Sequence, residues 1–137
     1  MAVKQVVPGL YQIGLGFVNA YLLDDGGRLT LVDTGVPGSE AKILAALAEL
    51  SKQPGDVKQI LVTHAHGDHS GGLAALKQAT GAPAYMHHAD AELVRRGESG
   101  RPVSAAPGVF NGVMYRMMAS RGPMQITPAE IEYCKPT

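Results

Sequence analysis

The feature that most constrains this chain is a group of three histidines and one aspartate within six positions, between a strand-like apolar run and a helical pattern. The group comprises His64, His66, Asp68 and His69. Residues two apart in an extended chain point the same way, so His64 and His66 can present two imidazoles to one ion. Gly67 allows a sharp turn, after which Asp68 and His69 can hold a second ion. The spacing therefore predicts a metal-binding loop between a strand and a helix.

The donor types indicate which metal suits this loop. Imidazole and carboxylate ligands without a thiolate favour zinc, with iron or manganese as weaker candidates. Magnesium and calcium prefer oxygen-only sites, which an imidazole-rich group does not supply. We therefore predict zinc as the cofactor, bound as a single ion or as a pair.

The pattern His-x-His-x-Asp-His resembles the signature of the metallo-β-lactamase superfamily of metallo-hydrolases. The stretch 17–35 carries the same resemblance, because it reads as a hairpin followed by the loop Asp-Thr-Gly. The resemblance implies that His64 and His66 hold a first metal. It also implies that Asp68 and His69 hold a second, and that Asp68 is catalytic because it orients the nucleophilic water.

Three further residues are expected near the ligands. In the family, the aspartate that matches Asp33 lies beneath the metal loop and orients it through hydrogen bonds. The alternative is that Asp33 caps a turn. His87 and His88 follow the predicted strand 84–86, and they come sooner after His69 than the family's next ligand does. We therefore place both at the mouth of the site and not among the ligands.

The length of the chain predicts a single domain over residues 1–137. Alternating and helical patterns place this domain in the α/β (α+β) class. Strands are expected over 3–7, 10–15, 17–23, 28–33, 58–63 and 84–86, and helices after Ser39, over 73–80, and over 91–96 with Asp90 as N-cap. This order predicts a mixed sheet flanked by helices on one side. Under the resemblance it is half of the family's αββα sandwich, truncated because the family's later ligands are absent. Since half a sandwich exposes an apolar sheet face, we expect a homodimer.

Beyond a loop over 97–108, apolar residues recur at helical spacing. They are Phe110, Val113, Met114, Met117 and Met118. Core packing explains such a methionine face best, and a lid over the metal cleft is the alternative.

Charge and composition narrow the choice of partners. Twelve basic residues balance twelve acidic ones, so no overall field attracts nucleic acid or anionic lipid. Cys134 is the only cysteine, which excludes an intrachain disulfide. The first residues do not combine a basic stretch with a long apolar one, so we expect no signal peptide, and no apolar run is long enough to span a membrane. We expect a cytoplasmic protein that acts on a small molecule, without nucleic-acid or membrane partners.

The predicted function is zinc-dependent hydrolysis of an ester, thioester or lactone-type small molecule by a metal-activated water. The form Thr-His-x-His-x-Asp-His-x-Gly-Gly is most similar to glyoxalase II and lactonase-type members of the family. His66 argues against the di-iron oxygen-reducing branch, which has glutamate there. One alternative is a catalytically incomplete half-domain that acts as a structural or weak metal-binding module. Another is an oxygen- or persulfide-handling iron protein with the same ligands.

Overall fold

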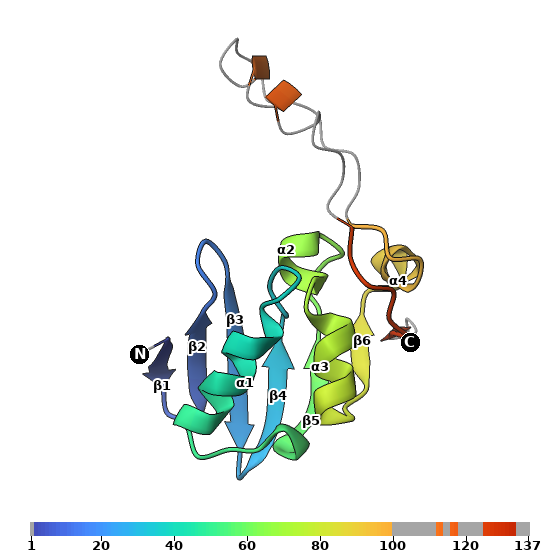
Figure 1. Cartoon of the computed structure of the whole chain (residues 1–137). Helices are drawn as coiled ribbons and strands as arrows, with labels where there is room; N and C mark the ends of the chain where they lie inside the picture. Colours follow the sequence, from blue (N-terminus) through green and yellow to red (C-terminus); the bar gives the residue numbers. More distant parts are fainter. Residues whose placement is uncertain (1, 100–111, 114–115, 118–124, 134–137) are drawn as a thin grey trace.

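The chain folds around one mixed sheet whose seven strands lie in sequence order (Figure 1). The computed structural model describes residues 2–99, 112–113, 116–117 and 125–133. The strands are β1 (Val3–Val7), β2 (Leu10–Gly14), β3 (Asn19–Asp25), β4 (Arg28–Val32), β5 (Val57–Leu61), β6 (Ala84–Met86) and β7 (Glu132–Tyr133). Strands β1 to β4 pair antiparallel, and β4 to β7 pair parallel. This confirms the predicted mixed sheet.

The antiparallel half follows from its turns. Gly26 and Gly27 form the two-residue link between β3 and β4, and both have positive φ, of 60° and 91°. That pair of conformations suits a tight hairpin and comes at no steric cost to glycine. The carboxylate of Asp24 accepts a hydrogen bond of 2.7 Å from the backbone N–H of Gly27. The predicted hairpin is therefore present, and the carboxylate of Asp24 stabilises its turn.

The parallel half follows from its helical crossovers. Helix α1 (Glu40–Glu49) and the short 3-10 helix η1 (Pro54–Asp56) link β4 to β5, and α2 (Gly67–Ser70) and α3 (Leu73–Thr80) link β5 to β6. Figure 1 shows α1 and α3 in front of the sheet, on the same face. The apolar side chains between these helices and the sheet are fully buried: Leu29, Leu31, Ile43, Leu47, Ile60, Leu73 and Leu76. This layer fixes the ends of the parallel strands, where the metal loop begins.

The opposite face of the sheet carries apolar side chains that remain partly in solvent. On β3, Ala20 and Leu22 are fully buried, whereas Tyr21 and Leu23 alternate with them and are 37% and 41% exposed. Successive side chains of a strand point to opposite faces, so Tyr21 and Leu23 mark the second face. The homodimer expected to cover this face stays a prediction.

Helix α4 (His88–Arg95) begins three residues earlier than the helix predicted over 91–96. Asp90 does not cap a helix over 91–96, because the helix begins earlier, with His87 as its N-cap. Nδ1 of His87 accepts a hydrogen bond of 3.2 Å from the backbone N–H of Ala89 and so does the capping that we assigned to Asp90. The carboxylate of Asp90 is therefore available for another contact.

Two other expectations concern the remaining segments. Of the methionine-face residues, Phe110, Met114 and Met118 lie outside the described residues. Val113 and Met117 are described, and they are 55% and 57% exposed, so the predicted core packing is wrong for these two side chains. The lid stays a prediction. In the described part of the chain, no helix combines the length and apolar character needed to cross a bilayer.

Candidate metal centre

The metal loop lies at the carboxyl end of β5, an edge at which open α/β sheets commonly bind ligands. His64 and His66 stand in the loop between β5 and α2, and Asp68 and His69 stand in α2 itself. Backbone hydrogen bonds from His69 and Ser70 to the carbonyl of His66, both 2.9 Å long, close the first turn of α2. This turn brings the two later ligand candidates back toward the first.

Three of the four predicted ligands come together. His64, Asp68 and His69 each offer a ligand atom within 4.8 Å of the others, and all three side chains are half-buried. The rings of His64 and His69 are 4.2 Å apart between centroids. His66 is exposed, and its ring lies edge-on to that of His64, with 4.8 Å between the ring centroids. Among the described residues, His66 lies beside the three-residue group and not within it. The predicted assignment of two ligands to each of two ions stays a prediction.

Asp33 lies beneath the loop and contacts it at three points. It follows β4, it is buried, and its φ of 64° is the left-handed conformation that aspartate tolerates. Oδ1 accepts a hydrogen bond of 2.8 Å from the backbone N–H of Thr63. The hydroxyl of Thr63 donates to the same carboxylate at 2.9 Å. Oδ2 lies 2.8 Å from Nδ1 of His69.

These contacts determine which imidazole nitrogens carry protons. Nδ1 of His69 donates to Asp33, so its Nε2 keeps a free lone pair. Nδ1 of His64 lies 2.9 Å from the hydroxyl of Thr63. Because that hydroxyl donates to Asp33, its oxygen accepts from Nδ1–H of His64, which leaves Nε2 of His64 free as well. One carboxylate thus prepares both histidines as ligands, the second of them through Thr63.

Burial lowers the pKa of His64, and the neighbouring His69 and His66 lower this pKa further against the opposing effect of the carboxylates. A depressed pKa keeps the imidazole of His64 neutral at neutral pH, the state that binds metal.

Sequence reasoning missed two residues that hold the loop, because their partners are distant or are backbone atoms. Thr34 is fully buried, and its N–H and hydroxyl both donate to the carbonyl of His69, at 2.8 and 2.7 Å. The hydroxyl of Ser70 lies 3.2 and 3.0 Å from the carbonyl oxygens of Ala65 and His66. The only sequence signal for Thr34 is its place in the Asp-Thr-Gly loop.

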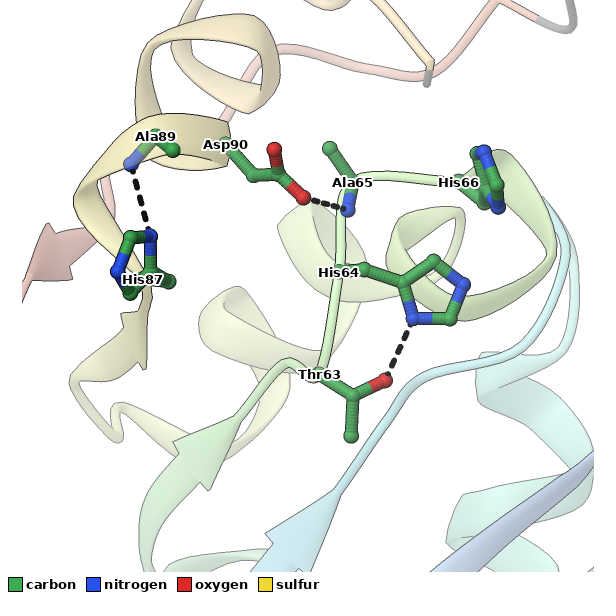
Figure 2. Close-up of a pocket in the computed structure, with 7 residues that line it drawn as sticks. All are labelled: Thr63, His64, Ala65, His66, His87, Ala89 and Asp90. Carbon is green, nitrogen blue, oxygen red and sulfur yellow. Dashed lines mark hydrogen bonds between the residues drawn. The ribbon is translucent and has the colours of Figure 1, made fainter. Parts of the chain in front are cut away.

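A pocket with a volume of about 590 Å³ opens beside the loop (Figure 2). Its lining consists of Thr63, His64, Ala65, His66, His87, Ala89 and Asp90. His87, predicted at the mouth of the site, lines this pocket. His88 is not among the lining residues, and its ring packs 4.3 Å from that of His87.

The donor set fits a divalent transition metal. Two imidazoles and a carboxylate converge, and hydrogen bonds leave Nε2 of both His64 and His69 free to bind. Three protein ligands with a further open position are typical of catalytic zinc sites.

Comparisons with known proteins agree with this geometry. The family model of the Metallo-beta-lactamase superfamily matches residues 13–132, and the chain belongs to this superfamily. A hydroxyacylglutathione hydrolase of Anaeromyxobacter dehalogenans is 43% identical over 75 residues, which cover 55% of this chain and 27% of the relative. The exodeoxyribonuclease WalJ of Streptococcus pneumoniae is 37% identical over 69 residues, which cover 50% of this chain and 25% of the relative.

Among solved structures, the subclass B3 metallo-beta-lactamase BJP-1 of Bradyrhizobium japonicum superposes with a TM-score of 0.76 at 26% identity. The match covers 98% of this chain and 46% of that structure. The chain therefore spans less than half of this solved relative and about a quarter of the two curated ones.

Proposed function

We propose that this chain carries the metal-binding half of a zinc-dependent hydrolase site. The observation that supports this most directly is the convergence of His64, Asp68 and His69 within 4.8 Å. When bound, zinc supplies a Lewis acid that acidifies water and polarises a substrate carbonyl. His64, Asp68 and His69 would hold the ion, with His66 beside them as the fourth donor.

The residues around the ligands have separate tasks in this proposal. Asp33 keeps the proton on Nδ1 of His69 and, through Thr63, on Nδ1 of His64. The carboxylate of Asp68 accepts a hydrogen bond from the attacking water and orients it. No serine or cysteine nucleophile is needed.

The pocket favours a small-molecule substrate. Its volume of about 590 Å³ is in the range of small-ligand sites. A relative named hydroxyacylglutathione hydrolase supports a thioester, with esters and lactones as the neighbouring chemistry. The formal net charge of zero gives no electrostatic support for a nucleic-acid substrate, although one relative is named an exodeoxyribonuclease.

The test is hydrolysis by zinc-loaded protein of a panel of thioesters, esters and lactones. We expect turnover of at least one class by the wild-type chain. We expect loss of turnover in Asp68→Asn even at saturating zinc, because Asp68 both binds the ion and orients the water. A zinc-loaded, folded wild type without activity on any class would contradict a hydrolase confined to this chain.

The catalytically incomplete half-domain is the second candidate. It is favoured by the exposure of His66 outside the three-residue group of the described residues. Weak zinc binding without hydrolysis would support this alternative.

A further inference from the structure

Asp90 joins α4 to the metal loop. Its Oδ2 accepts a hydrogen bond of 3.2 Å from the backbone N–H of Ala65. Ala65 is the residue between His64 and His66, and only 1% of its surface is exposed. Figure 2 shows Asp90 reaching Ala65 from the side opposite the imidazole of His64. The backbone between the first two predicted ligands is thus tied to a helix that follows β6.

This bond complements the contacts made from β4. Asp33 accepts from the N–H of Thr63, two residues before Ala65. Each bond has a carboxylate oxygen as acceptor, at 2.8 Å for Asp33 and 3.2 Å for Asp90. Two carboxylates from different parts of the chain therefore fix the backbone on both sides of His64.

Helix α4 gives Asp90 a fixed base. Ala91 and Val94 on this helix are fully buried. The carbonyl of Val94 accepts a backbone hydrogen bond of 3.4 Å from Ala129, which ties the helix to the segment before β7. An acceptor on such a helix can hold the loop at a defined position, which a flexible surface carboxylate cannot do.

We propose that Asp90 is a positioning residue of the metal loop, which sets the relative placement of the imidazoles of His64 and His66 through the N–H of Ala65. With respect to metal, this inference rests on the proposed function. The loop geometry itself does not depend on a bound ion.

The experiment compares four full-length chains: wild type, Asp90→Ala, Asp90→Asn and Glu92→Ala. Asp90→Asn keeps an oxygen acceptor without the charge. Glu92→Ala removes an exposed carboxylate from the same helix and is the matched control. The readouts are amide hydrogen exchange at Ala65 in metal-free protein, and Co²⁺ affinity with the visible spectrum of the Co²⁺ complex.

We expect exchange at Ala65 to be fastest in Asp90→Ala, intermediate in Asp90→Asn and unchanged in Glu92→Ala, because local exchange reports how firmly an amide is bonded. Co²⁺ affinity should fall about 10- to 100-fold in Asp90→Ala, the usual effect of losing a partner that orients a metal site. The Co²⁺ spectrum should shift in Asp90→Ala and be largely restored in Asp90→Asn.

Wild-type exchange at Ala65 in both Asp90 variants would overturn the inference, as would an equal change in Glu92→Ala. If Asp90→Ala fails to fold, the comparison rests on Asp90→Asn. Wild-type exchange at Ala65 in that variant contradicts the intermediate exchange that loss of the charged acceptor predicts. A wild-type chain that binds no Co²⁺ would refute the proposed function, while exchange at Ala65 would still decide the role of Asp90.

Discussion

At the scale of single residues, the site depends on where two protons lie. The carboxylate of Asp33 accepts a hydrogen bond from the Nδ1–H of His69 and is linked to the Nδ1–H of His64 through the hydroxyl of Thr63. A buried carboxylate that orients an imidazole is a usual partner of a metal-binding histidine. Here a single carboxylate orients two histidines, so the connecting hydroxyl is a sensitive point of the site.

We predict that Thr63→Val lowers zinc affinity by about 10-fold, the lower end of the effect of losing an orienting partner. Valine has nearly the same shape but leaves Nδ1 of His64 without its acceptor. Thr63→Ser should restore affinity, because serine keeps the hydroxyl. Competition with a chromophoric chelator measures the affinity, and a Thr63→Val protein with wild-type affinity would show that the relay is irrelevant.

We also predict that His64 titrates below its ordinary pKa of 6.5 in the metal-free chain, mainly because burial lowers its pKa. The unfolded state then binds more protons than the folded state as the pH falls through 6.5, so this group makes the folded chain less stable on acidification. Histidine NMR signals followed against pH measure the shift. A value above 6.5 for His64 would be incompatible with this sign.

At the scale of elements, α2 and the start of α3 depend on a close approach to the loop after β4. A Cβ at Gly71 would overlap the carbonyl of Gly67 and the ring of Pro37, and a Cβ at Gly72 would overlap the carbonyl of Thr34. Neither glycine has positive φ, so any residue could adopt the backbone conformation. Glycine is required at both positions because there is no space for a Cβ atom.

Gly71→Ala should therefore destabilise the chain by about 1–3 kcal/mol, the usual cost of overpacking. It should also weaken zinc binding, because α2 carries Asp68 and His69. Gly55→Ala is the control, since a Cβ there meets nothing within 4 Å. Urea unfolding of the two variants measures the difference, and equal stabilities would argue against the close approach.

The sequence predicted elements well where the signal is local. Helix α3 and strand β6 match their predicted bounds, and Gly81, at a φ of 70°, ends the helix as expected. The prediction was less accurate where contacts with residues distant in the sequence determine the structure. Phe17 was placed in a strand but is 78% exposed before β3. Thr34 went unrecognised, and Asp90 was assigned to a helix cap. Their true partners, a carbonyl and an N–H of the loop, leave no periodic pattern in the sequence.

At the scale of the whole molecule, the sheet has one face covered by α1 and α3 (Figure 1). Tyr21 and Leu23 on the other face of β3 are 37% and 41% exposed. Burying such a face is favourable by about 25 cal/mol per Å² of apolar surface, which is the physical reason for the predicted homodimer.

We predict a dimer in sedimentation experiments and a shift toward monomer in Leu23→Lys. A lysine on this face would place a charge in the contact. Ala45→Lys introduces the same charge on the exposed side of α1 and should leave the dimer intact. A stable, folded monomer at low concentration would rule out the dimer.

The most direct test of the metal centre is the metal content of the chain, measured by elemental analysis on protein purified without added metal, with His64→Ala and His69→Ala in parallel. We predict about one or two zinc ions per wild-type chain, the number that three or four such donors support. Both variants should lose zinc and remain folded. A folded wild-type chain that holds no metal, and takes up none when zinc is added, would contradict the metal centre and with it the proposed hydrolase.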